Sequence, residues 1–350
     1  MADNTKIEWT DATWNPITGC SIVSPGCTNC YAMKLAGTRL RHHPSRTGLT
    51  KDSKAGPVWT GEVRFNPEWL DQPLRWKRPR MIFVCAHGDL FAEGVPDEWI
   101  DQVFAVMALS PQHTFQVLTK RPERMRTYLA RPRHLLASRW ATAVPRGLPI
   151  TQHEAMARLH PDATPEHRAL YHACPLAIPL ANVWLGVSVE DQKRAEERIP
   201  VLLDTPAAIR WISAEPLLGP LDLTCIHQPN DGFGPYWINA LKSDEVGWFH
   251  DEAATLATEA DPLAFSDLPR LDWVVVGGES GHGARPMQPE WAESLRDQCA
   301  AAGIPFLFKQ WGSHKQTSDC NGRYMMPATK KEAGRRLDGI EHNGFPEVRR

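Results

Sequence analysis

The sequence has no long apolar run, no recognisable signal peptide and no large excess of charge of either sign. A helix that spans a bilayer needs about 20 consecutive apolar residues, so the chain is not expected to have a membrane partner. It starts with the polar stretch MADNTKIEWTDATWN, which predicts a cytoplasmic protein. The formal net charge is −2 and the pI is about 6.7, so a global basic surface for nucleic acid is excluded, whereas a local basic groove is not.

Several common catalytic motifs are also missing. The glycine-rich stretch Gly277-Gly278-Glu279-Ser280-Gly281 lacks both the G-x-G-x-x-G spacing of a dinucleotide site and the lysine of a P-loop. It still allows close approach of the backbone to a ligand. There is no H-E-x-x-H zinc helix and no G-x-S-x-G nucleophile elbow.

A cysteine-rich loop is the most informative feature that is present. Residues 13–32, TWNPITGCSIVSPGCTNCYA, hold Cys20, Cys27 and Cys30 in a C-x6-C-x2-C array among turn-forming glycines and prolines. Three thiolates from one loop are typical ligands of a soft metal or an iron–sulfur cluster. Structural zinc takes four protein ligands, so three cysteines favour an iron site with one open position. The alternative is a site closed by a fourth side chain, for which the candidates are His42, His43, Cys85 and His87.

The rest of the chain alternates apolar strands with helices. After a short strand at 14–19, strands are expected at 80–86, 114–119, 182–189, 209–214, 273–276 and 305–308, with helices at 29–40, 96–109, 190–203 and 289–302 and another opening at 120–122. Continuous apolar strands separated by helices indicate a parallel sheet that is covered on both faces. We predict an α/β fold, a partial (β/α)6-type TIM barrel with parallel strands and two insertions. A single domain is expected over 1–312, with insertions at about 131–181 and 222–270 and a C-terminal tail at 313–350.

Polar residues recur where the predicted strands end, which is where parallel α/β barrels place their chemistry. They are His87, Asp89, Thr119, Lys120, Ser188, Glu190, Glu215, Glu279, Ser280 and Lys309. Structural roles stay open for some of them. Asp89 or Glu190 could cap the following helix, and Glu215 and Glu279 could be paired with arginines.

The basic stretch 41–60, RHHPSRTGLTKDSKAGPVWT, has two interpretations. One is a solvated loop. The other is a lid or a contact to a substrate phosphate.

The cysteine loop and the polar strand ends together resemble the radical S-adenosylmethionine (radical SAM) superfamily. The usual loop there is C-x3-C-x2-C, and this chain has six residues in the first gap. The stretch WTDATWNPITGCSIVSPGCTNCYA resembles a phage-associated three-Cys-motif family of unknown function. That family is itself similar to radical SAM enzymes of the spore photoproduct lyase-like branch. The resemblance runs from Lys6 to the FKQWG stretch that ends at Gly312.

The resemblance implies a [4Fe-4S] cluster on Cys20, Cys27 and Cys30, with S-adenosylmethionine (SAM) on the open iron. Reductive cleavage of SAM would give a 5′-deoxyadenosyl radical that abstracts hydrogen from a substrate, with an external electron donor such as flavodoxin or ferredoxin. By position in the family pattern, the cofactor contacts would fall to Tyr31, His87, Asp89, Ser188, Glu190 and Glu215. Lys120, in LTKRP, matches a T-K of the lyase-like branch, and Lys120 and Glu279 are the candidate catalytic residues.

A nucleotide or nucleic acid is the first substrate class that we expect, and Arg39, Arg41, Arg46, Lys51 and Lys54 add modest support. Two other hypotheses remain open. One is a non-enzymatic, phage-related binding protein that zinc or a cluster stabilises. The other is a degenerate barrel that keeps the cluster without SAM chemistry.

Overall fold

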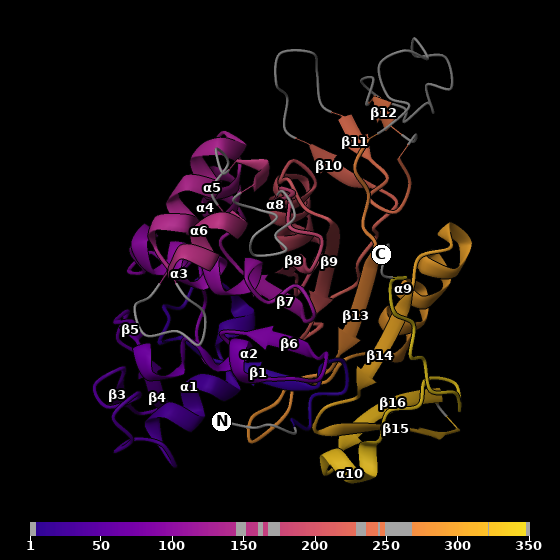
Figure 1. Cartoon of the computed structure of the whole chain (residues 1–350). Coiled ribbons are helices and arrows are strands. Elements are labelled where there is room, and N and C mark those ends of the chain that lie inside the picture. Colours follow the sequence, from indigo (N-terminus) through magenta and orange to yellow (C-terminus); the bar gives the residue numbers. More distant parts are fainter. Residues whose placement is uncertain are drawn as a thin grey trace. The chain divides into compact units, whose positions relative to one another are not determined.

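The computed structural model describes residues 5–144, 152–159, 164–166, 176–228, 236–243, 246–248, 268–320 and 322–347. Figure 1 labels the helices and strands of the chain. The chain divides into two compact units, the first made of Met1–Leu185 with Thr205–Ala208 and the second of Gly186–Asp204 with Ile209–Arg350. Within the described ranges, no helix is both long and apolar enough to cross a membrane.

The main sheet confirms the predicted α/β class. Across the described residues it has seven strands in the order β1-β6-β7-β8-β9-β13-β14, which is also their order along the chain. Four neighbouring pairs of this sheet are parallel: β1 with β6 and β6 with β7 in the first unit, and β9 with β13 and β13 with β14 in the second. Parallel strands added one after another are typical of a partial TIM barrel, whereas a doubly wound sheet reverses its strand order. The strands are β1 (Ala12–Trp14), β6 (Met81–Val84), β7 (Thr114–Thr119), β8 (Val183–Ser188), β9 (Ile209–Ala214), β13 (Trp273–Gly277) and β14 (Phe306–Gln310).

The first strand starts earlier than expected and is split. Instead of one strand over 14–19, β1 ends at Trp14 and a separate strand, β2 (Ile17–Thr18), pairs with β5 (Arg64–Phe65). Pro16 lies between them and has no backbone N–H to donate to a ladder, so the strand cannot continue through it. This break turns the chain out of the main sheet just before the cysteine loop.

The first unit carries its helices and two small hairpins beside its strands. The helices are α1 (Tyr31–Gly37), α2 (Gln72–Arg75), α3 (Asp97–Ala108), α4 (Pro122–Leu129), α5 (Arg133–Thr142) and α6 (Gln152–Leu159), with 3-10 turns at Pro25–Cys27 and Pro67–Trp69. The basic stretch 41–60, one interpretation of which was a loop, contains an antiparallel hairpin of β3 (Thr50–Ser53) and β4 (Gly56–Trp59). This hairpin packs on α1.

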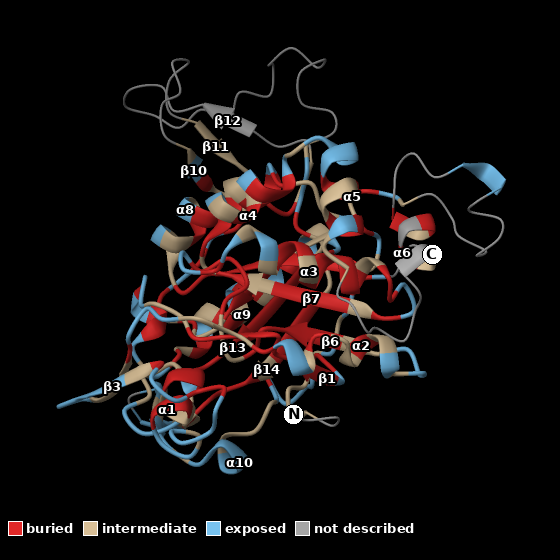
Figure 2. Cartoon of the chain, turned by 60° about the vertical axis from the view of Figure 1, so that its left-hand side comes forward, coloured by how far each residue is buried: buried red, intermediate tan, exposed pale blue. Residues whose placement is uncertain are grey.

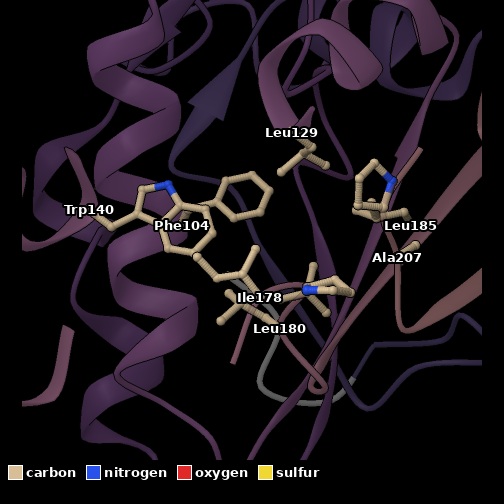
Figure 3. Close-up of a pocket in the computed structure, with 10 residues that line it drawn as sticks. Phe104, Leu129, Trp140, Ile178, Leu180, Leu185 and Ala207 are labelled. Atoms are coloured by element: carbon tan, nitrogen blue, oxygen red, sulfur yellow. The ribbon is translucent and has the colours of Figure 1, made fainter. Parts of the chain in front are cut away.

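The core of the first unit includes one small void. Phe104, Leu129, Trp140, Leu180 and Leu185 are among the residues around it, and its volume is about 20 Å³ (Figure 3). That is room for about one water molecule, but the lining is apolar and offers no hydrogen bonds to a water. This mostly apolar hollow therefore offers little to orient a polar ligand.

The second unit has a core of tryptophans and valines. All residues of β13 are buried (Figure 2). The Trp211 and Trp273 rings lie 5.3 Å apart. Gly186 on β8 makes room for this layer, because a Cβ there would come within 2.5 Å of the Trp211 ring. The unit's other elements are α8 (Gln192–Leu203), β10 (Ile226–Gln228), β11 (Tyr236–Ile238), β12 (Val246–Trp248), α9 (Pro289–Ala302), β15 (His314–Asp319), β16 (Gly322–Pro327) and α10 (Lys330–Ala333).

The two expected insertions fall only partly within the described residues. The first, about 131–181, includes α5 and α6. The second, about 222–270, includes the three-stranded antiparallel sheet β10-β11-β12. Other parts of both lie outside the described ranges.

Candidate functional site

The cysteine loop connects β2 to α1 in the first unit. Gly19 starts it at a φ of 96°, donates its N–H to the His87 carbonyl at 3.2 Å and forms a bridge with Gly88. A Cβ at Gly19 would come within 2.2 Å of the Glu62 carbonyl oxygen, and a Cβ at Gly88 would come within 3.1 Å of the carbonyl oxygens of residues 17 and 19. The loop is thereby fixed to the end of β6.

The three cysteines are free thiols that are buried or half-buried. Burial raises the pKa of Cys20 to about 12, and the charges of Asp89, Cys30 and Cys27 raise it too. Burial also raises the pKa of Cys30. Two cations act in the opposite direction, because Arg121 lowers the pKa of Cys20 and Lys120 lowers that of Cys30. The three thiols therefore interact electrostatically with one another, and the side chains of Arg121 and Lys120 add positive charge near them.

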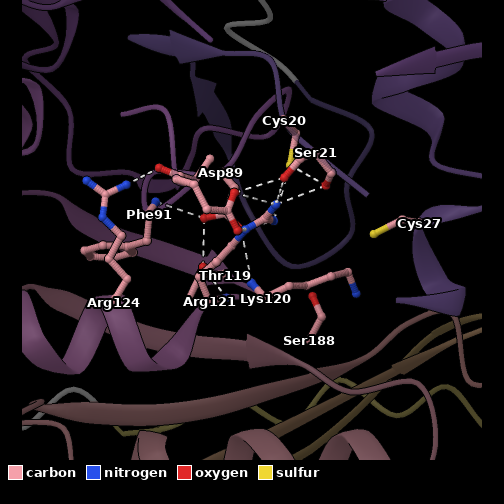
Figure 4. A network of polar contacts seen from close by, with 12 residues as sticks. Cys20, Ser21, Cys27, Asp89, Phe91, Thr119, Lys120, Arg121, Arg124 and Ser188 are labelled. Atoms are coloured by element: carbon pink, nitrogen blue, oxygen red, sulfur yellow. Dashed lines mark hydrogen bonds and ion pairs between the residues drawn. The ribbon is translucent and has the colours of Figure 1, made fainter. Parts of the chain in front are cut away.

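Arg121, at the start of α4, links the cysteine loop to the end of β6 (Figure 4). Its Nη1 donates to Cys20 Sγ at 3.4 Å and to Asp89 Oδ2 at 3.1 Å. Its Nη2 donates to the Ser21 carbonyl at 3.0 Å, and its Nε donates to Glu93 Oε1 at 3.2 Å. Arg121 is only 6% exposed, so these bonds form largely out of contact with water. Burial lowers the pKa of Arg121, but Asp89, Cys20 and Glu93 together raise it above its usual value, so the guanidinium stays charged.

Asp89 lies in the site but is fully engaged by the chain itself. Its Oδ1 accepts from the Phe91 N–H at 2.9 Å and from the Thr119 hydroxyl at 2.7 Å. Its Oδ2 accepts from the Lys120 N–H at 3.1 Å as well as from Arg121. The buried carboxylate therefore holds β7 and Arg121 in place, and it offers little further capacity for a cofactor.

Tyr31 and His87 lie together on the other flank of the loop. Their rings are 6.1 Å apart in an edge-on arrangement, and the Tyr31 hydroxyl donates to the Ala86 carbonyl. Tyr31 is 54% exposed. His87 Nδ1 accepts from Arg46 Nη2 at 2.6 Å, and burial together with the Arg46 charge lowers the His87 pKa to about 4. His87 is therefore neutral at pH 7, with its proton on Nε2.

None of the proposed fourth ligands completes a metal site. Within the ranges that the structure describes, no group of three or more His, Cys, Asp or Glu side chains is arranged to hold a metal ion. His87 Nδ1 is occupied by Arg46, and His43 Nδ1 lies 2.7 Å from the Ser45 hydroxyl. A single zinc ion would need four donors within bonding distance, whereas in a cluster each thiolate binds a different iron and the sulfurs stay farther apart. In number and chemistry, three thiols from one loop are the donor set of a three-thiolate cluster.

In the second unit, the predicted residues at the ends of β8 and β9 are paired. Glu190 is fully buried and accepts from Arg198 Nη1 at 2.9 Å, and the same nitrogen donates to the Ser188 carbonyl at 2.7 Å. The residue that caps α8 is Asp191, not Glu190. Glu215 accepts two bonds from Lys309 Nζ, at 2.7 and 2.9 Å.

Glu279 likewise has a partner. Its carboxylate accepts from the Arg285 backbone N–H at 2.8 Å, from Nε at 3.0 Å and from Nη2 at 2.6 Å. The structural alternative, pairing with arginine, is therefore what the geometry shows for Glu279. For Glu215 the partner is a lysine.

The glycine stretch after β13 serves packing instead of a ligand. A Cβ on Gly278 would come within 2.1 Å of the Trp311 carbonyl oxygen, and one on Gly312 would come equally close to the Glu279 carbonyl. The close backbone approach that the sequence indicates is thus made to the chain's own segment after β14.

Sequence reasoning missed the arginines that organise the first unit's site. Arg121 follows Lys120 directly in LTKRP, and the only available signal was a second cation at a strand end. Arg46 lies in the basic stretch for which a solvated loop was one interpretation, and it was named only among the residues that support a nucleotide or nucleic-acid substrate, yet it is 4% exposed. Both arginine side chains are held by residues that are distant in sequence, Asp89 for Arg121 and His87 for Arg46. No local sequence pattern predicts such contacts.

The chain is an α/β protein whose parallel strands are added to the main sheet in sequence order. A loop with three free thiols lies next to the first strands of that sheet. The chain belongs to the family described as "Protein of unknown function (DUF5131)", whose model matches residues 4–346. No curated protein and no solved structure matches the chain.

Proposed function

We propose that the chain is a radical SAM-type enzyme of the cytoplasm, related to the phage-associated three-Cys-motif proteins and to the spore photoproduct lyase-like branch. Cys20, Cys27 and Cys30 would hold a [4Fe-4S] cluster with one open iron. When bound, the cluster supplies an electron for cleavage of SAM to a 5′-deoxyadenosyl radical. The proposed substrate class is a nucleotide or nucleic acid, and the electron comes from a donor such as flavodoxin or ferredoxin.

The observation that carries the proposal is the charge arrangement around three free thiols from one loop. A cluster with three thiolates is an anionic group, and here Arg121 and Lys120 both act on these sulfurs as cations. The N–H group of Arg121 also donates directly to Cys20. Hydrogen bonds to cluster sulfurs and nearby charge are the protein's means of setting a cluster's potential.

The chain's own residues have defined roles in this proposal. Asp89 and Glu93 hold Arg121 against Cys20, so they position it and do not touch the reacting atoms. Lys120 remains the candidate catalytic residue in the first unit because its charge reaches Cys30. Glu279 is a weaker candidate, because its charge is already neutralised by Arg285.

The first test is anaerobic purification followed by quantification of iron, sulfide and zinc. We expect about four irons and four sulfides per chain, and a change in the electron paramagnetic resonance spectrum of the reduced protein when SAM is added. Stoichiometric zinc, or a cluster that is indifferent to SAM, would contradict the proposal.

Single alanine variants of Cys20, Cys27 and Cys30 should each lose most of the iron. The matched control is Cys225→Ala, which removes a half-buried free cysteine outside the loop. If Cys225→Ala loses iron equally, or if the loop variants keep it, the assignment of the ligands is wrong.

A further inference from the structure

Three arginines are buried within the described ranges, and one of them differs from the other two. Arg121 pairs with Asp89 and Glu93, and Arg198 pairs with Glu190. Arg46 is buried just as deeply but has no carboxylate within ion-pair distance in the described part of the chain.

The contacts of Arg46 are all to neutral acceptors. Its Nη1 donates to the Ser45 carbonyl at 3.1 Å and to the Ser45 hydroxyl at 2.7 Å, and its Nη2 donates to His87 Nδ1. Its guanidinium lies 5.9 Å from the centre of the Trp69 ring. Burial of a cation without a counter-charge is costly, and proteins ordinarily avoid it.

The surroundings add positive charge instead of cancelling it. Burial and the neighbouring cation Arg64 lower the pKa of Arg46 to about 10, so the group is still charged at pH 7. Arg64 itself donates to the carbonyls of Pro44 and Thr47, at 2.5 and 2.7 Å, and to no carboxylate in the described residues. Two adjacent arginines thus share an environment that lacks negative charge.

The position of this pair next to the thiol loop indicates what would complete it. The Ser45 carbonyl accepts from the Thr18 hydroxyl at 2.8 Å, His87 directly precedes the glycine that contacts Gly19, and Tyr31 follows Cys30. An anion bound by Arg46 would meet the Nε2–H of a neutral His87, with the half-exposed Tyr31 ring beside it. Guanidinium groups prefer phosphate and carboxylate, which they bind with paired N–H groups.

We propose that Arg46, with Arg64 and His87, forms a binding site for an oxyanion, which is a phosphate or carboxylate group of a ligand that binds at the cysteine loop. The site would give the proposed enzyme its preference for anionic substrates, so in that sense it rests on the proposed function. The binding itself needs no cluster, and the two ideas can fail separately.

Thermal unfolding at constant ionic strength tests the proposal, with inorganic phosphate, AMP, adenosine and SAM as probes. A ligand that binds only the folded state raises Tm, and at a hundredfold excess over its Kd we expect a rise of roughly 5 °C with phosphate or AMP and none with adenosine. The Arg46→Met variant should lose this rise. It should also unfold at the same temperature as the unliganded wild type or higher, because an unpaired buried charge is removed.

Arg198→Met is the matched control for stability, since it removes an equally buried arginine that has a carboxylate partner. It should unfold well below the wild type, because the buried Glu190 carboxylate loses its ion pair with Arg198. The proposal is overturned if the Tm of Arg46→Met falls as far as that of Arg198→Met and no anion raises the Tm of the wild type. Arg46 would then be a structural residue.

The probes also identify the source of the oxyanion. A rise with SAM alone that Arg46→Met abolishes would assign the site to the SAM carboxylate, and a rise with phosphate and AMP would assign it to the substrate. The same measurements on Cys27→Ala separate the two proposals. If phosphate still raises the Tm of Cys27→Ala, the oxyanion site is supported independently of the iron content. If phosphate raises the Tm of wild type and Arg46→Met equally, the proposed site is wrong.

Discussion

At the scale of single residues, Arg121 forms two ion pairs in the candidate site, and the carboxylates of these pairs differ in solvent exposure. The Arg121–Asp89 pair is 7% and 6% exposed at its side chains, whereas Glu93, the other partner of Arg121, is 62% exposed. Solvent screens the second pair and not the first, so the two should contribute very differently to stability.

Arg121→Gln should lower the free energy of unfolding by about 3–5 kcal/mol, since it leaves the Asp89 carboxylate buried without a counter-charge. Denaturant titration of the metal-free protein measures this. The control is Glu93→Gln, which should cost under about 1 kcal/mol because that carboxylate is screened by water. Equal losses in the two variants would show that Asp89 does not depend on Arg121.

His87 gives a pH dependence with a defined sign. Its pKa in the fold is about 4, below the ordinary value of about 6.5, so the unfolded chain binds more protons between these two pH values. Stability is therefore lost as the pH falls from about 6.5 towards 4, with unfolding coupled to uptake of up to about one proton. His87→Asn should show a shallower loss over that window. Parallel curves for wild type and variant would mean that His87 titrates normally in the fold.

At the scale of elements, close approach of backbone segments fixes the loops at the strand ends. Gly19 and Gly88 bring the cysteine loop to the end of β6, and Gly278 and Gly312 join the segments after β13 and β14. In both places a side chain would collide with backbone atoms, which cannot move aside as a flexible side chain can.

Gly278→Ala should destabilise the protein by about 1–3 kcal/mol, because its Cβ would overlap the Trp311 carbonyl oxygen. The matched control in the same unit is Gly219→Ala, whose Cβ would meet only the Asp191 side chain at an ordinary 3.5 Å. Thermal unfolding of both variants measures the difference. A Gly278→Ala protein as stable as Gly219→Ala would show that the segments can separate there without cost.

At the scale of the whole chain, residues beyond 312 complete the core of the second unit. The Phe308 N–H donates to the His342 carbonyl at 3.1 Å, and the Trp273 Nε1–H donates to the Gly344 carbonyl at 2.8 Å. Leu337 is fully buried, and the Phe345 ring lies 5.1 Å from that of Trp273. The C-terminal tail thus packs on the strands that precede it.

Phe345→Ala should therefore cost about 1–2 kcal/mol, the value of a partly buried aromatic contact. Ile340→Ala is the control, because Ile340 is 61% exposed and its replacement should change stability by less than about 0.5 kcal/mol. Equilibrium unfolding of both proteins is the measurement. Identical midpoints would mean that the tail's aromatic contact adds nothing to the core.

The sequence by itself determined the strands of the main sheet and most helices, because a strand buried on both faces must be apolar along its whole length. The stretches around 114–119, 182–189 and 273–276 became β7, β8 and β13 almost without change, and α9 begins and ends at the residues expected. It also singled out the thiol loop, since cysteine spacing among turn residues is a local pattern. Proline at position 16 was the one local signal left unused at the first strand.

Only the tertiary structure decided which charges meet. Arg121 reaches Cys20 across 101 positions of sequence, and Lys309 reaches Glu215 across 94. The sequence does not show whether a carboxylate at a strand end binds a ligand or pairs with an arginine. The roles of Glu279 and Asp89 could therefore not be assigned before their partners were known. The same holds for Arg46, whose burial beside His87 depends on how the loop before β3 folds back onto the end of β6.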